Sequence, residues 1–504
     1  MHSKKVINNS LISFFYRIVI LILGFFTRKI FIIYLGEEVL GLNSLYSNLL
    51  DLLNLAELGI GVAVQFQLYE PLVNNDRLKL SKIISAARKI YNFIGCFIAV
   101  MGLLLTPFIH YFIKETTFPM WFVRCSFLIS VSGISLSYFF VHEKLFLLAD
   151  EENGLVNIIE LIAKIFIIII SLISTVIFKN YFVYLAINAL YWLIVNVIIH
   201  FIFRKKYPQV LSNIKDNKEE IKDLTSNLKN VVPMKLSNYV YNSTDNVIIS
   251  KVIGLTTVAL YSNYMTIING IMGMEYLMGN IIMASMGKKI NELQNPKRLY
   301  KYYLLYQYAQ FIFTNFATVI LTLVCSPFIT IWIGEKYVVN NCIFALLVID
   351  FYIHSMYQPA YVMYGATGQF KNDKIITGIS AVLNIVFSII LVNFIGLSGV
   401  IIGTIITDIY IWFVRTYQMI RKYFDENIIK YAIKMIVYIL STLISVFVSL
   451  IISNNIVCHS IFVDIIVKIF ISFFVSAIIV FLITYRDSDT KELFKYIKKY
   501  VKRG

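Results

Sequence analysis

Residues 160–206 read ELIAKIFIIIISLISTVIFKNYFVYLAINALYWLIVNVIIHFIFRKK. This stretch holds two apolar runs, which only Lys179 and Asn180 separate and which the basic cluster 204–206 closes. A helix needs roughly 20 mostly apolar residues to cross a bilayer, and each run meets that length. Strands of a membrane barrel are only about 10 residues long and alternate apolar with polar positions, which these runs do not. The stretch therefore predicts two consecutive transmembrane helices.

Similar runs follow one another along the whole chain. Of the 504 residues, 59% are hydrophobic and 15% are aromatic, more than the surface of a soluble protein carries. Because backbone polar groups in lipid must be hydrogen-bonded within the protein, these runs predict an all-α polytopic membrane protein. We place about fourteen transmembrane helices, at 9–35, 40–69, 83–113, 119–148, 153–178, 181–204, 229–253, 257–285, 299–333, 339–366, 373–393, 396–420, 430–453 and 460–485.

The positions of positive charges test this arrangement, because loops that stay in the cytoplasm accumulate Lys and Arg. Alternate connections and the helix ends beside them hold 33 of the 45 Lys and Arg residues. The opposite connections hold four, namely Lys114, Lys179, Lys251 and Lys336. We therefore expect both termini in the cytoplasm.

The net charge of +16 lies mostly in these predicted cytoplasmic segments. There it would face anionic lipid headgroups, so the charge predicts the bilayer as partner and requires no nucleic acid. Within the basic tail, residues 491–503 have apolar residues interspersed among the lysines, a pattern typical of a short amphipathic helix lying on the membrane surface.

An internal repeat suggests how the helices are organised. Leu45-Tyr46-Ser47-Asn48 recurs as Leu260-Tyr261-Ser262-Asn263, each copy follows a Gly-containing turn, and six predicted helices separate the copies. An even number of helices between copies predicts two parallel six-helix lobes, and chance similarity of two apolar helices is the alternative. The resulting segments are an N-terminal lobe 1–204, a cytoplasmic linker 205–228, a C-terminal lobe 229–420, two further helices in 421–486, and the tail 487–504.

Polar residues gather on single faces of the first two predicted helices. In the first helix Ser13, Arg17, Gly24 and Arg28 fall within about 60° of one another, at 100° per residue. Lys29 points elsewhere. In the second helix a polar arc of about 80° is predicted, with Glu57 just outside it. The residues of this arc are Asn43, Ser47, Asp51, Asn54, Gly61 and Gln65.

The seventh and eighth helices repeat this pattern. Polar residues share one side of the seventh helix, and Glu275 is the carboxylate of the eighth. The residues concerned in the seventh helix are Lys235, Asn238, Tyr239, Asn242, Asp245 and Asn246. Because buried ionisable groups in membranes usually line a cavity or pair with another helix, we predict a polar cavity between the two lobes.

The predicted cavity combines cations with amides and a few acids. Arg17, Arg28 and Lys235 suit a phosphate group, since guanidinium pairs bidentately with phosphate, and the amides and Tyr239 can hydrogen-bond sugar hydroxyls. Asp51, Asp245 and Glu275 are candidates for binding a coupling ion, H⁺ or Na⁺, with neutralising pairs to the cations as the alternative. An anionic, polyhydroxylated cargo fits this composition better than an apolar one.

Several enzyme classes lack support in the sequence. We find no glycine-rich nucleotide-binding loop and no outer loop long enough for a catalytic domain, so we predict a transporter without a cofactor. The five cysteines have no paired spacing and suggest neither a metal site nor a disulfide framework. His110, His142 and His354 are isolated, and we interpret them as packing or interfacial residues.

Some stretches are similar to a known family. The segment from Arg28 to Glu70, with its Gly41-Leu42-Asn43-Ser44-Leu45 and Leu53-Asn54-Leu55-Ala56-Glu57-Leu58-Gly59, resembles the opening of bacterial polysaccharide repeat-unit flippases. These Wzx-type proteins belong to the multidrug/oligosaccharidyl-lipid/polysaccharide exporter superfamily. Asp245-Asn246-Val247-Ile248-Ile249-Ser250, and Ile395-Gly396-Leu397-Ser398-Gly399-Val400, resemble later segments of that family.

The resemblance implies alternating-access movement of an undecaprenyl-pyrophosphate-linked oligosaccharide from the cytoplasmic to the outer leaflet of a bacterial plasma membrane. The polysaccharide would be an O-antigen, capsule or exopolysaccharide, and a polymerase and glycosyltransferases would be partners. The family's charged cavity positions match Arg17, Arg28 and Lys235. Fourteen helices depart from the twelve usual in many such flippases, and helices 13 and 14 could line a lipid-tail groove, as in the related peptidoglycan-precursor flippase, or be structural.

Three other functions stay open. The chain could move a teichoic-acid-type lipid-linked unit, which the sequence does not distinguish from an oligosaccharide. An exporter of amphipathic cations would need an acid-lined cavity, which Arg17 and Lys235 disfavour. A polytopic polymerase or glycosyltransferase usually needs a large outer loop, which this chain lacks.

The charge pattern predicts that the 205–228 linker is cytoplasmic. In a cysteine-free background, an Asp216→Cys variant should not react with a membrane-impermeant thiol reagent added to intact cells, and should react after the cells are opened. Strong labelling of intact cells would contradict the topology.

Overall fold

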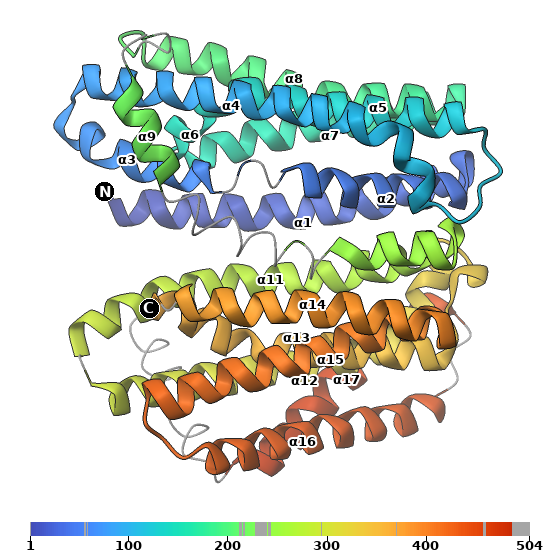
Figure 1. Ribbon diagram of the computed structural model, residues 1–504. Coiled ribbons are helices and arrows are strands. Elements are labelled where there is room, and N and C mark those ends of the chain that lie inside the picture. Colours follow the sequence, from blue (N-terminus) through green and yellow to red (C-terminus); the bar gives the residue numbers. More distant parts are fainter. Residues whose placement is uncertain are drawn as a thin grey trace. The chain divides into compact units, whose positions relative to one another are not determined.

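A computed structural model describes residues 2–54, 57, 59–210, 214, 217–226, 239, 243–293, 295–368, 370–456 and 460–485. All regular structure in these ranges is helical, which confirms the all-α prediction (Figure 1). Within them, twelve helices are long and apolar enough to cross a membrane. The chain is a multi-pass membrane protein, and the predicted count of fourteen spans is approximate.

The chain divides into two compact units, Met1–Ser262 and Asn263–Gly504. In unit 1, α7 packs against α1 and α8, α5 packs against α4 and α8, and α9 lies on α3 and α4 (Figure 1). A further helical segment, 243–252, precedes α11. The elements of unit 1 are α1 (His2–Leu35), α2 (Glu37–Asn54), α3 (Ile60–Asn74), α4 (Arg77–Leu105), η2 (Thr106–Phe112), α5 (Met120–Ser137), η3 (Tyr138–Phe140), α6 (Val141–Ala149), α7 (Asn153–Phe178), α8 (Tyr181–Lys206) and α9 (Lys218–Ser226).

The break between α7 and α8 follows from the two polar residues inside the apolar stretch 160–206. Lys179 ends α7 in a left-handed conformation with φ 47°. The Asn180 side chain then accepts hydrogen bonds from the backbone N–H groups of Phe182 and Val183 and caps α8. Such a cap stabilises a helix by about 1 kcal/mol. Beyond the turn, apolar residues of α7 and α8, among them Ile167 and Val195, form a common core.

The single predicted helix 40–69 is wrong, because the chain breaks there into α2 and α3. Gly59 has φ 83°, a conformation that glycine adopts without the steric cost of a side chain, and α3 begins directly after it. The polar arc predicted for this helix therefore ends with α2, and Gly61 and Gln65 belong to a separate helix.

Other predicted boundaries differ less. The predicted helix 83–113 is α4 followed by the 3₁₀ segment η2, which contains Pro107, and the predicted helix 119–148 is interrupted by η3. Most of the predicted helix 229–253 lies outside the described residues, as does the tail helix at 491–503.

Unit 2 contains most of α11 and six further long helices. In it α15 packs against α13 and α14, while α12 contacts α13, α16 and α17 (Figure 1). Its elements are α11 (Leu255–Leu293), α12 (Pro296–Trp332), η4 (Glu335–Tyr337), α13 (Asn341–Thr367), α14 (Phe370–Ile395), α15 (Leu397–Tyr417), η5 (Gln418–Tyr423), α16 (Ile428–Asn454) and α17 (Ile461–Thr484). The division between the units falls inside α11, so the predicted lobe and linker boundaries stay a prediction.

The two copies of the repeated tetrapeptide have similar settings and different partners. Each lies in a helix that follows a glycine of positive φ, Gly36 at 90° and Gly254 at 137°. The hydroxyl of Tyr46 donates to the carbonyl of Val123, whereas that of Tyr261 donates to Asp245. The repeat relationship stays a prediction.

Close packing of α14 against α15 depends on two glycines of α15. A Cβ placed on Gly399 would lie 2.3 Å from the carbonyl of Leu391, and one placed on Gly403 would lie 2.5 Å from the Ser388 hydroxyl. Small residues four positions apart let membrane helices approach this closely, since van der Waals contact replaces the hydrophobic effect there.

We predict that Gly399→Ala destabilises the protein by about 1–3 kcal/mol, because the new methyl group meets backbone atoms that cannot move independently. The purified variant should lose structure at lower temperature than wild type. Gly287→Ala is the matched control, since its nearest contact would be a carbonyl at 3.9 Å. Equal melting of both variants would show that the α14–α15 contact tolerates a wider spacing.

Candidate functional site

A polar cluster in unit 1 is centred on Asn48 of α2. Its side-chain amide donates to the carbonyl of Ser243 at 2.8 Å, and its Oδ1 accepts from Asn246 at 3.3 Å. The hydroxyl of Tyr239 donates to the Asn48 backbone carbonyl. We call these four residues the Asn48 cluster. It ties α2 to Tyr239 and to the segment 243–252 through polar contacts.

The predicted phosphate ligand Arg28 also bonds to a hydroxyl group of another helix in unit 1. Its guanidinium donates to the Ser262 hydroxyl, which also accepts from Ser44 of α2 at 3.3 Å. Arg28 therefore joins α1 to the start of α11, with hydroxyl groups as its neighbours. These hydroxyls are neutral hydrogen-bonding groups.

Arg17 lies nearer the start of α1 than Arg28 does. The apolar window of α1 runs from Ile18 to Leu35, so Arg17 immediately precedes it. Arg28 lies eleven positions after Arg17, which places their Cα atoms about 16 Å apart at 1.5 Å per residue. The Arg17 side chain lies outside the described part of the chain, as do Lys235, Asn238 and Asn242 in their entirety.

Two of the predicted cavity residues bond to neighbouring helices of unit 1. Asn43 accepts from the hydroxyl of Tyr181 and Asn54 from that of Tyr138, both at 3.2 Å. Ser47 is exposed and donates to the carbonyl of Asn43 in its own helix. Part of the polar face of α2 thus serves helix packing.

The three predicted ion-coupling acids have different environments. Asp51 is exposed on α2. Asp245 is buried and accepts from the Tyr261 hydroxyl at 3.0 Å. Glu275 of α11 is only 3% exposed and accepts from Ser355 of α13 at 2.6 Å. Each of the two buried acids bonds to a neutral hydroxyl group.

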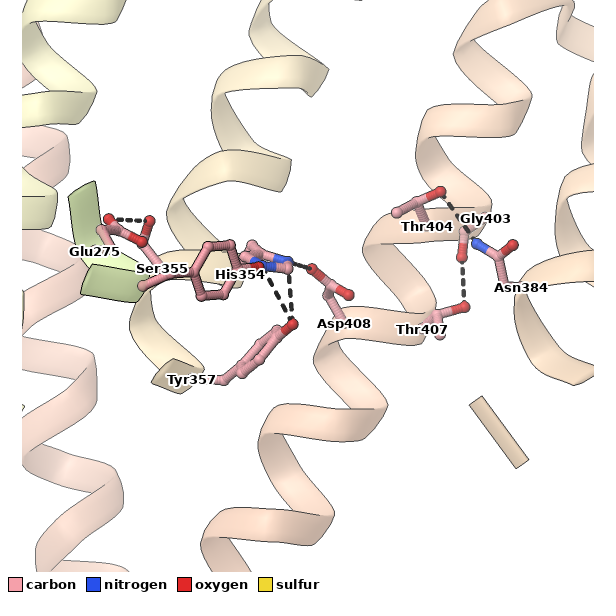
Figure 2. Close-up of polar contacts among 10 residues, drawn as sticks. Glu275, His354, Ser355, Tyr357, Asn384, Gly403, Thr404, Thr407 and Asp408 are labelled. Carbon is pink, nitrogen blue, oxygen red and sulfur yellow. Dashed lines mark hydrogen bonds and ion pairs between the residues drawn. The ribbon is translucent and has the colours of Figure 1, made fainter. Parts of the chain in front are cut away.

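Glu275 belongs to a buried polar network that extends across unit 2 (Figure 2). His354 of α13 lies with its Nδ1 atom 3.1 Å from Asp408 Oδ2 of α15, and its Nε2 atom lies 2.8 Å from the Tyr276 hydroxyl of α11. The Tyr357 hydroxyl is within 3.1 and 3.3 Å of the two ring nitrogens. The network therefore connects α11, α13 and α15.

Two further groups adjoin this network. Arg415 of α15 donates to Asp373 of α14 at 2.9 Å, and its guanidinium lies over the ring of Tyr357 at 5.8 Å. Asn384 of α14 donates to Thr404 of α15 at 3.2 Å (Figure 2). In the described part of the chain no three His, Cys, Asp or Glu side chains converge as metal ligands would.

Sequence reasoning missed Asn48, His354 and Asp408. The interpretation of His354 as an isolated packing residue is wrong, because it hydrogen-bonds to groups 54 and 78 positions away. Its signal was its position in an apolar helix, where an ionisable residue is costly and usually functional. Asn48 lies inside the repeated tetrapeptide, yet periodicity alone did not distinguish it from its neighbours.

Unit 2 also has two apolar cavities along α12, one beside residues 308–316 and the other beside residues 318–326. One, of about 610 Å³, lies between α12 and α17 and is lined by Ile312, Phe316, Phe473 and Phe481, among others. The second, of about 760 Å³, lies among α12, α13, α15 and α16. Both have the size and lining of sites for hydrocarbon groups.

The Asn48 contacts predict a stability difference between neighbouring residues. Asn48→Ala removes two interhelical hydrogen bonds of about 1 kcal/mol each, so the purified variant should melt at lower temperature. Ser47→Ala is the control, since Ser47 is exposed and its hydroxyl donates to the Asn43 carbonyl within its own helix. A control that melts as low as Asn48→Ala would contradict this account.

Comparison with known proteins gives the fold. No family model and no curated protein matches the sequence. The solved structure of the lipid II flippase MurJ in an inward closed conformation has a TM-score of 0.71 at 16% identity, over 95% of this chain and 99% of that one. Two structures of multidrug resistance MATE family transporters of the MOP superfamily, inward-facing and outward-facing, have TM-scores of 0.65 and 0.59 at 14% and 15% identity. They cover 81% and 82% of this chain, and 98% and 93% of their own. This chain has the fold that MurJ and the MATE transporters share.

Proposed function

We propose that this protein is a flippase that moves undecaprenyl-pyrophosphate-linked oligosaccharide repeat units from the cytoplasmic to the outer leaflet. It would act by alternating access in the plasma membrane of a bacterium, with both termini in the cytoplasm, during synthesis of an envelope or capsular polysaccharide. Glycosyltransferases would supply its cargo, and a polysaccharide polymerase would consume it. This activity is transport and needs no catalytic residue.

The observation that carries the proposal is a cation within an apolar span, in a fold shared with a lipid flippase. Arg28 lies ten residues inside the window Ile18–Leu35 and donates to the Ser262 hydroxyl, which in turn accepts from Ser44. A guanidinium at that depth is costly unless an anion or polar groups compensate it. A pyrophosphate supplies such an anion and accepts bidentate hydrogen bonds.

About 16 Å along α1 separates the Cα atoms of Arg17 and Arg28, and Arg17 immediately precedes the apolar window in which Arg28 lies. We infer that Arg17 meets the pyrophosphate at the cytoplasmic end of this window and that Arg28 binds it deeper in the span. Lys235 is the third proposed ligand, from the other lobe.

The sugar and the lipid have separate proposed contacts. Amides and a phenol on the polar faces would bond sugar hydroxyls, a role we assign to Asn43, Ser47, Asn54, Asn238, Tyr239, Asn242 and Asn246. The apolar cavity between α12 and α17 would hold part of the isoprenoid chain, since aromatic and aliphatic side chains line it. The lipid-linked cargo thereby accounts for both the polar and the apolar features.

Energy for transport would come from a downhill H⁺ or Na⁺, since no nucleotide-binding motif was found. Asp51, Asp245 and Glu275 are the coupling candidates from the sequence. Ion binding shifts the equilibrium between the inward-facing and outward-facing conformations only to the extent that the ion's affinities for the two differ. Glu275 is the most buried of the three, so its charge is the most sensitive to its surroundings.

The proposed anion site predicts graded effects in liposomes that contain purified protein and undecaprenyl-pyrophosphate-linked oligosaccharide. Arg28→Ala and Arg17→Ala should each slow flipping roughly ten- to a hundredfold, the loss of one or two charge-assisted hydrogen bonds. Arg28→Lys should recover part of the rate, because lysine keeps the charge and loses the bidentate geometry.

Lys29→Ala is the matched control, one residue and about 100° around the helix from Arg28, and should flip at the wild-type rate. Full activity of both alanine variants would contradict a phosphate role. If a teichoic-acid-type precursor were flipped and the oligosaccharide not, the substrate assignment would be wrong while the flippase assignment would hold.

A further inference from the structure

A buried histidine and a buried aspartate face one another between α13 and α15. His354 is 6% exposed and Asp408 is 0% exposed, and 3.1 Å separates Nδ1 from Oδ2. Tyr276 of α11 extends the pair, its hydroxyl 2.8 Å from His354 Nε2 (Figure 2 shows the pair). A chain of hydrogen bonds thus runs through three membrane-spanning helices.

The charged and titratable groups around the pair come from α11, α13, α14 and α15. Arg415 lies near both His354 and Asp408, and it also pairs with Asp373. Other ionisable groups include Glu275 beside Tyr276, and Tyr357, Tyr361 and Asp350 on α13. Among these described groups, carboxyl groups outnumber the permanent cation Arg415.

This charge balance makes proton binding by the pair favourable. With His354 neutral and Asp408 ionised, the pair carries one buried negative charge, which is costly in a low-dielectric interior. One added proton makes the pair neutral overall, whichever of the two side chains holds it. Such a pair titrates as a unit.

The added proton also changes the hydrogen bond to Tyr276. In the charged pair Nδ1–H donates to Asp408, so Nε2 has no hydrogen and accepts from the Tyr276 hydroxyl. In the neutral pair Nε2 carries a hydrogen, both as imidazolium next to carboxylate and as imidazole next to carboxylic acid. Nε2 then donates to Tyr276, and the direction of the α11–α13 hydrogen bond is reversed.

We propose that the His354–Asp408 pair is a proton-binding site whose loading is transmitted to α11 through Tyr276. The described residues hold no group of three His, Cys, Asp or Glu ligands here, whereas a proton needs only the pair. The role of this proton in transport rests on the proposed flippase function, and proton binding itself does not. The site would supply the coupling that Asp51, Asp245 or Glu275 alone would otherwise have to provide.

Nuclear magnetic resonance of ring-¹⁵N histidine in nanodiscs tests proton binding directly. The sequence has six histidines, so His354→Gln identifies the His354 signals by their disappearance. Between about pH 5 and pH 9, the Nε2 signal of wild type should move from that of a bare nitrogen to that of a protonated one as pH falls. In Asp408→Asn this change should occur at a pH lower by about one unit or more, because the carboxylate is gone.

Flipping in liposomes with an imposed pH gradient tests coupling. His354→Gln and Tyr276→Phe should keep flipping without a gradient and lose the acceleration that the gradient gives wild type. His200→Gln is the matched control, since His200 also hydrogen-bonds a buried carboxylate, Glu143, at 2.9 Å in unit 1. It should respond to the gradient as wild type does.

The outcomes separate the two proposals. A His354 signal that does not change over this pH range overturns the proton site, and so does a wild-type gradient response in both His354→Gln and Tyr276→Phe. If no lipid-linked substrate is flipped while the His354 signal titrates as expected, the flippase function fails and the proton site stands. Gel filtration identifies variants that do not fold. In that case the pH titration of the wild-type His354 signal decides whether the pair binds a proton.

Discussion

The structure depends on one constraint, namely that lipid offers no hydrogen-bond partner to the backbone. Each apolar run must satisfy its N–H and C=O groups internally, so the described chain is built of helices joined by short connections. Helix association in lipid cannot rely on the hydrophobic effect, and close contact and polar bonds replace it. Gly399 and Gly403 allow close contact between α14 and α15, and Asn48 provides a polar bond between helices.

The same constraint limits where charged side chains can lie inside the helices. A buried ionisable group is stable only where a neighbour compensates it, so its partners indicate its role. Arg415 has Asp373, a pairing that can hold α14 and α15 together without any ligand. Arg28 donates to the Ser262 hydroxyl, and Glu275 accepts from Ser355, so neutral hydroxyl groups take part in compensating both.

Both units bury ionisable groups. In unit 1, Arg28 bonds to the Ser262 hydroxyl, and the buried Glu143 lies 2.9 Å from His200. In unit 2, His354 meets the carboxyl group of Asp408 and the phenol of Tyr276. In the proposed function, Arg28 suits an anionic cargo and the His354–Asp408 pair suits a proton.

The sequence by itself determined the helical class, the membrane location and most helix positions, because apolar run length is a local property that bilayer thickness converts directly into structure. It also identified Arg28 and Glu275, since an ionisable residue within an apolar run stands out locally. It did not determine the break at Gly59, where the backbone conformation depends on neighbouring helices. Only the tertiary structure brought His354 to Asp408 and Tyr276, and Asn48 to Ser243, because helices distant in sequence must pack before their side chains can meet.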